Sequence, residues 1–255
     1  MRFAVIFLFL LSCTTVLSQT RIIKDVVCET IDTADILVRN ELFFKAYHES
    51  MLNLDECIGK LSEADSLTLK QIPLPISIKD EFVVALALFP DIRDKNLKFK
   101  YKKIRGTMNA RPDFFNIIRS KSNRKYIVLI NNNKGRYKGI PLEDLTPGAR
   151  LGWYGHEIAH LQSYQMMSNV QMILFTIRYL TSVKYVKKAE RFTDFLAIER
   201  GLVFQIYESG KYLAKYGNVT KAYKKMNVFN SLTLDEYICL WHMLGFRNFI
   251  NDECK

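Results

Sequence analysis

The residues with the clearest capacity for chemistry lie in one short stretch. His156 and His160 are two of only four histidines in the 255-residue chain, and Glu157 directly follows the first of them. Two residues four positions apart project from the same face of an α-helix, one turn from each other. Two imidazole nitrogens at this spacing can bind one metal ion, while the glutamate acts on a water molecule that the metal holds. The pattern therefore predicts a hydrolytic metal site; a polar helix face and a chance occurrence are the alternatives.

A catalytic zinc site needs a third protein ligand and leaves its fourth position to water. His48 and His242 are the remaining histidines, but Glu190 is a better candidate. Glu190 and Asp194 are four positions apart, so they would share one face of a second helix. Glu190 is the expected third ligand, and Asp194 and Glu199 are the alternatives.

The motif needs a rigid helix to present it, and the sequence contains the signals that begin one. Thr146 is a good N-cap residue, and Pro147 suits the first helical position. On a helix that begins there, Leu151 and Ile158 belong to an apolar stripe, and the two histidines fall together on the other face. We therefore expect the motif at the middle of a helix with one buried face.

The remaining sequence alternates between helical and strand patterns. Apolar residues at helical spacing predict helices over residues 24–62, 80–90, 165–180, 186–213 and 231–245. Residues 97–108 and 125–132 have the composition of strands, with a turn expected at 110–114. We expect an α+β fold that is mostly helical, with a small antiparallel-rich sheet before the motif helix.

The two motifs together resemble those of the gluzincin family of zinc metallopeptidases, which carry HExxH on one helix and ExxxD on a second. The matching residues are His156-Glu157-Ile158-Ala159-His160 and Glu190-Arg191-Phe192-Thr193-Asp194, and the resemblance covers residues 96–201. The sequence around the two motifs, GHEIAH and ERFTDFLAIERG, is similar to that of uncharacterised exported bacterial zincin-like proteins. The resemblance implies a zincin-like domain in which an edge strand, expected at 125–131, lines the cleft.

The resemblance also implies a role for each motif residue. His156, His160 and Glu190 would bind Zn²⁺, and Asp194 would accept the N–H of a ligand imidazole. Glu157 would act as general base towards a metal-activated water and would pass the proton to the leaving amine.

The implied activity is hydrolysis of peptide bonds in a peptide or protein held along the edge strand. A further donor would stabilise the oxyanion, and the candidates are His242, Tyr154, Tyr164 and Tyr237. The alternative function is that of a non-catalytic exported scaffold or binding protein with the zincin fold, which would bind metal without cleaving anything. A third interpretation is a basic envelope-binding module in which the motif is accidental.

The first residues have the pattern of a signal peptide. A short positive start precedes an apolar run at 4–11, and Ser18 offers a cleavage site, so residues 1–18 are the expected signal. A lipid anchor at Cys13 is the alternative, and both predict export to the periplasm or the extracellular space. Residues 19–255 are expected to form one domain, with a helical N-terminal part (19–90), a catalytic core (91–213) and a helical C-terminal part (214–255).

Cysteine content and charge agree with export. Cys28, Cys57, Cys239 and Cys254 would remain after cleavage, and this even set allows two disulfides in three connectivities, with Cys28–Cys57 and Cys239–Cys254 the expected pairs. The formal net charge of +11 is spread over many basic segments. Because no nucleic-acid-binding module accompanies these segments, we expect peripheral association with an anionic envelope surface and no specific nucleic-acid partner.

Overall fold

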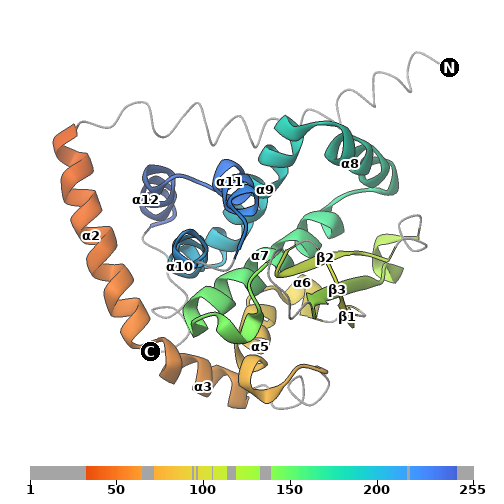
Figure 1. Ribbon diagram of the computed structural model, residues 1–255, viewed down its shortest axis with the longest axis horizontal. Coiled ribbons are helices and arrows are strands. Elements are labelled where there is room, and N and C mark those ends of the chain that lie inside the picture. The colour runs from red at the N-terminus through yellow and green to blue at the C-terminus, as the bar shows by residue number, and fades with distance from the viewer. Residues whose placement is uncertain are drawn as a thin grey trace.

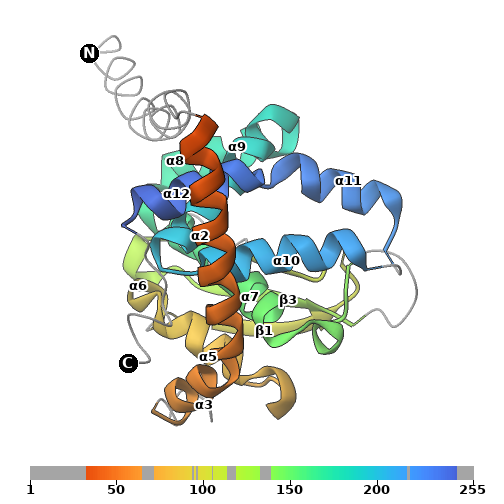
Figure 2. The ribbon, with the colours of Figure 1, turned by 90° about the vertical axis from the view of Figure 1, so that its left-hand side faces the viewer.

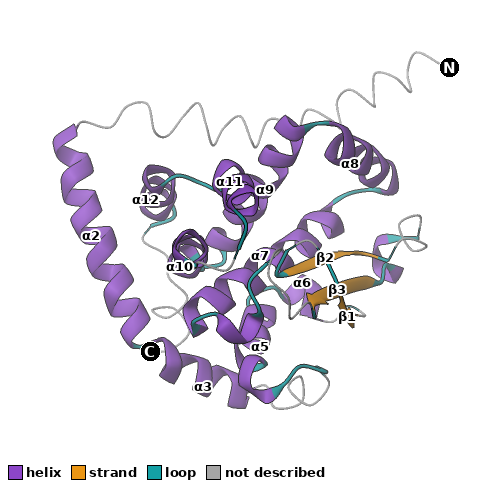
Figure 3. Cartoon of the chain, in the orientation of Figure 1, coloured by secondary structure: helices purple, strands orange, loops and turns teal. Residues whose placement is uncertain are grey.

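The computed structural model describes residues 33–245, apart from 65–71, 94, 96, 105, 114–118, 133–138 and 217–218. The predicted signal peptide and Cys13 therefore lie outside the described residues. The described part of the chain is mostly helical and contains one small sheet (Figure 3). The α+β class and the predominance of helix are thereby confirmed.

Most helices follow the sequence pattern, but residues 33–64 form two helices and residues 221–230 form one that the pattern did not indicate. Their bounds are α2 (Thr33–Leu52), α3 (Leu54–Ala64), α5 (Asp80–Ala87), α6 (Pro90–Arg93), α7 (Pro147–Met166), α8 (Asn169–Thr181), α9 (Val183–Glu199), α10 (Val203–Lys215), α11 (Lys221–Asn230) and α12 (Leu234–Met243). Thr146 caps α7 as predicted, because its side chain accepts the backbone N–H of Ala149. The long segment predicted at 186–213 is two helices, and Gly201 with a φ of 87° lies between them. A positive φ is a conformation that glycine adopts without steric cost.

The sheet differs from the expectation. It contains β1 (Leu97–Lys102), β2 (Met108–Pro112) and β3 (Tyr126–Asn131) in the order β1-β3-β2. β3 is parallel to β1 and antiparallel to β2, so the sheet is mixed and not antiparallel-rich. The turn predicted at 110–114 was wrong in part, because residues 110–112 belong to β2. Gly106, with a φ of 128°, instead turns the chain between β1 and β2.

β3 is the central strand, which corrects the prediction that residues 125–131 form an edge. Its residues from Tyr126 to Ile130 are all buried, as expected of a strand with a neighbour on each side. β2 is an edge strand, and it contacts α7. The edge beside the motif helix is therefore β2.

Helix α7 runs through the middle of the molecule, with the sheet on one side and α9 to α12 on the other (Figure 1). It contacts α5, α9, α10 and β2. A Cβ atom on Gly152 would lie 2.0 Å from the backbone oxygen of Gln205, and one on Gly155 would lie 2.2 Å from the side chain of Leu202. Glycine at these two positions lets α10, and Leu202 just before it, pack directly against α7. This contact holds the motif helix in place.

A single apolar core extends from α2 to α12. α2 crosses outside α10 and α12 (Figure 2), and its buried Phe43 packs edge-on against Phe204 and Trp241. No helix among the described residues is both long enough and apolar enough to cross a membrane.

The cysteines correct one predicted disulfide. Cys57 is disulfide-bonded, and its partner lies outside the described residues, as do Cys28 and Cys254. Cys239 carries a buried thiol in α12. The predicted pairing of Cys239 with Cys254 was therefore wrong, because this buried side chain keeps its sulfur as a thiol.

Candidate metal centre

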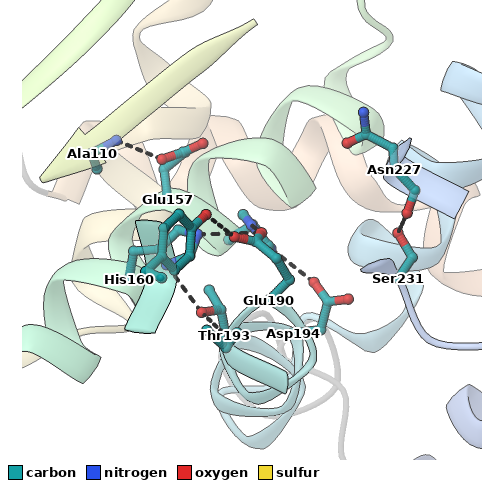
Figure 4. Close-up of polar contacts among 11 residues, drawn as sticks. Ala110, Glu157, His160, Glu190, Thr193, Asp194, Asn227 and Ser231 are labelled. Atoms are coloured by element: carbon teal, nitrogen blue, oxygen red, sulfur yellow. Dashed lines mark hydrogen bonds and ion pairs between the residues drawn. The ribbon is translucent and has the colours of Figure 1, made fainter. Parts of the chain in front are cut away.

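Helices α7 and α9 bring the three predicted ligands together. One donor atom each from His156, His160 and Glu190 lies within 4.8 Å of the other two. Glu190 Oε2 is 3.2 Å from His156 Nε2 and 3.6 Å from His160 Nε2. Figure 4 shows Glu190 reaching from α9 towards the motif helix. The spacing along each helix thus produces the expected convergence on one point.

The Nδ1 atom of each imidazole, which is the nitrogen that does not face Glu190, contacts a side chain of α9. Asp194 Oδ1 is 2.8 Å from His156 Nδ1, and Thr193 Oγ1 is 3.1 Å from His160 Nδ1. The Thr193 hydroxyl donates its only hydrogen to Ala189 O at 2.9 Å, so it accepts from His160. Neutral imidazoles held in this way carry their proton on Nδ1 and present the lone pair of Nε2. This arrangement is typical of metal-binding histidines.

Thr193 and Tyr179 are site residues that the sequence did not reveal. Tyr179 from α8 donates its hydroxyl to Glu190 Oε1 at 2.5 Å. The two oxygens of Glu190 are thereby divided, with Oε1 held by Tyr179 and Oε2 facing the histidines. Thr193 lies three positions after Glu190, so helical spacing could have indicated it. No local pattern points to Tyr179, because it comes from a different helix.

Glu157 is set apart from the ligand group. Its side chain is buried, and its Oε2 accepts the backbone N–H of Ala110 in β2 at 2.6 Å. Burial raises the pKa of Glu157, and the neighbouring His160 and His156 partly offset this effect. Glu157 therefore lies beside the centre without belonging to it, and its carboxylate is more basic than usual.

The charges of the centre compensate each other. Burial would lower the pKa of His156, but its hydrogen bonds to Asp194 and Glu190 outweigh burial and raise this pKa well above its usual range. Burial would raise the pKa of Glu190, but the charge of His160 and the hydrogen bond from His156 hold it well below its usual range. The Glu190 carboxylate thus stays ionised at a half-buried position. Two imidazole nitrogens and one carboxylate oxygen are a donor set that catalytic Zn²⁺ accepts, so the residues fit this ion.

The alternative ligands do not join the group. Asp194 contacts the outer nitrogen of His156, on the side away from Glu190 Oε2. His48 and Glu199 are exposed on α2 and α9, and neither belongs to the described group of metal-binding side chains.

A cavity of about 320 Å³ opens beside the centre. His156, Glu157, His160, Glu190 and Asp194 all line it, together with residues of β2, α8, α10, α11 and α12. The three candidate ligands therefore border a cavity and are not enclosed in the core.

Among the four predicted oxyanion donors, the cavity includes only Tyr237. His242 is exposed in the last turn of α12 and is absent from the described cavity wall, so the structure does not bring it to the site. The Tyr154 hydroxyl donates to Ile78 O at 2.9 Å inside the core. Tyr164 stacks on His160 with ring centres 6.0 Å apart, but it does not line the cavity in the described part of the chain. The cavity also includes Tyr179 and Tyr223, which the sequence did not single out.

Comparisons with protein-family models, with curated proteins and with solved structures find no match for this chain.

Proposed function

We propose that this protein is a zinc-dependent hydrolase of peptide bonds. The observation that carries the proposal is the convergence of His156, His160 and Glu190 within 4.8 Å at the edge of an open cavity. The three side chains would hold Zn²⁺ and leave a position open towards the cavity. When bound there, Zn²⁺ supplies Lewis-acid chemistry, which makes a water more acidic and polarises a carbonyl group.

Glu157 is the proposed general base. Its position directly after His156 puts its carboxylate beside the ligand group, and the Ala110 N–H holds one of its oxygens. The second oxygen can take a proton from the attacking water and deliver it to the leaving amine. Because burial raises the pKa of Glu157, the carboxylate is a stronger base than an exposed one.

An extended peptide is favoured as substrate because β2 is an edge strand of the described sheet. The Ala110 N–H points to Glu157 and therefore away from β3. Along an antiparallel strand, the backbone groups of successive residues point alternately towards and away from the partner strand. The N–H and C=O of Met108, two residues before Ala110, therefore also point away from β3. Pro112, the next outward residue, has no N–H to leave unpaired. Met108 and Asn109 line the cavity, so a peptide paired with β2 would pass the metal centre.

The non-catalytic scaffold is the weaker alternative. A scaffold that only binds metal has no use for a buried carboxylate beside the ligands, and burying Glu157 is costly in free energy.

Zinc analysis combined with a peptide assay tests the proposal. The purified protein should contain about one zinc per chain and cleave members of a broad peptide library, and chelation should abolish cleavage reversibly. His160→Ala should lose both zinc and cleavage. Full zinc retention in His160→Ala would contradict the ligand assignment.

A further inference from the structure

The cavity has a second wall, formed by residues of α10 and α11, that the proposed chemistry does not use. The residues of α10 that line this wall are Ile206, Ser209, Gly210 and Leu213. These positions are separated by three, four and seven residues, which places them on one helical face. The charged residues Glu208 and Lys211 of the same helix are absent from the cavity lining.

Helix α11 repeats this arrangement. Its contribution to the wall is Tyr223, Met226, Asn227 and Asn230, again at the spacing of one helical face. None of the three lysines of α11 lines the cavity, although they make up almost a third of its ten residues. Figure 4 shows Asn227 and the neighbouring Ser231 across the site from Asp194.

The absence of charge on this wall is not a requirement of packing. Met226 is 52% exposed although it lines the cavity, so a charged side chain there would reach water. All the ionisable carboxylates and imidazoles that line the cavity belong instead to α7 and α9. A charged substrate group placed against the buried part of this wall, at Ile206 and Leu213, would lose hydration and gain no partner of opposite charge.

Gly210 lies at the exposed rim of the cavity. No heavy atom lies within 4 Å of the position that its Cβ would occupy, whereas Gly152 and Gly155 are required by close helix contacts. Glycine inside a helix is unfavourable compared with alanine. The missing side chain at position 210 leaves the mouth of the cavity open beside Ile206 and Leu213.

We infer that the α10–α11 wall is a substrate subsite for an uncharged, apolar side chain of a peptide, with Met226 and Gly210 as specificity-determining residues. The inference rests on the proposed function for the identity of the ligand as a peptide. The apolar side chain would contact Ile206, Leu213 and Met226, and the amides of Asn227 and Asn230 would face the peptide backbone.

A binding measurement tests the subsite without requiring turnover. The probes are acetylated and amidated hexa-alanine peptides with one Leu, Asp or Lys at each position in turn. Each probe is titrated calorimetrically into the zinc-loaded Glu157→Gln protein. The subsite predicts one position at which Leu binds about tenfold or more tighter than Asp or Lys, as burial of one apolar side chain allows.

Two substitutions on the same helix provide the matched comparison. Met226→Lys puts a positive charge on the wall and should abolish the preference for Leu and favour Asp at that position. Val228→Lys makes the same kind of change at a residue of α11 that is 67% exposed and does not line the described cavity, and it should leave the preference unchanged.

Gly210→Leu should weaken Leu-peptide binding about tenfold or more. Gly59→Leu, in α3 and equally open around its Cβ, should not.

The outcomes separate this inference from the proposed function. Equal binding of Leu, Asp and Lys probes, no binding at all, or equal effects of Met226→Lys and Val228→Lys would overturn the subsite. A protein that shows the binding preference but, with Glu157 restored, cleaves nothing would contradict the hydrolase and leave the subsite standing.

Discussion

The proposed metal ligands depend on two residues that are not themselves proposed as ligands. Thr193 and Asp194 each hold the outer nitrogen of one imidazole, and they are consecutive in α9. One turn before them in the same helix, Glu190 supplies the third donor. The α9 helix therefore both completes the centre and orients the two histidines of α7.

Thr193→Val tests this orienting role. Valine keeps the shape of threonine but cannot accept the His160 N–H, so we expect zinc affinity to fall about 10–100-fold. The measurement is competition with a chelator of known affinity. Thr181→Val is the control, because its hydroxyl bonds the carbonyl oxygen of Ile177 in the same way at an exposed position of α8. Equal zinc affinity in Thr193→Val and the wild-type protein would contradict the role.

At the scale of elements, the site depends on how closely α10 packs behind α7. Gly152→Ala would place a methyl group 2.0 Å from the Gln205 backbone oxygen, which cannot be relieved by a side-chain rotation. We expect this substitution to lower the free energy of unfolding by about 1–3 kcal/mol. Gly59→Ala, where nothing lies within 4 Å, should raise it by about 0.5–1 kcal/mol. Denaturant unfolding measures both, and equal effects would show that the α7–α10 contact is not tight.

The elements that could be predicted are those set by local sequence. Thr146 and Pro147 begin α7 where the sequence indicated, and helical spacing correctly placed His156 and His160 on one face. The strand order could not be predicted, because residues 97–102 and 126–131 pair across a long separation and the period of two does not select the partner. For the same reason the sequence did not single out Tyr179 and could not show that His242 lies outside the described cavity wall, since tertiary packing alone decides which side chains enter the cavity.

For the whole molecule, the centre joins α7 to α9 and so links the middle of the fold to its C-terminal helices. An ion that binds only the folded chain stabilises it by about 2.7 kcal/mol at a free concentration of 100 times Kd. For a chain of this size, the Tm should rise by several degrees on addition of zinc. His48→Ala, an exposed substitution on α2, should keep this rise, whereas His160→Ala should lose it. A zinc-dependent rise in Tm of the same size in His160→Ala would place the ion elsewhere.

We propose that Glu157 performs chemistry at a metal centre to which it does not contribute a ligand. The most direct measurement compares Glu157→Gln with the wild-type protein for peptide hydrolysis and zinc content in the same preparations. Glutamine can still accept the Ala110 N–H but cannot take a proton from water, so hydrolysis should fall about 10²–10⁴-fold while zinc content stays near one per chain. Hydrolysis at the wild-type rate by the zinc-loaded Glu157→Gln protein would show that Glu157 is not the general base.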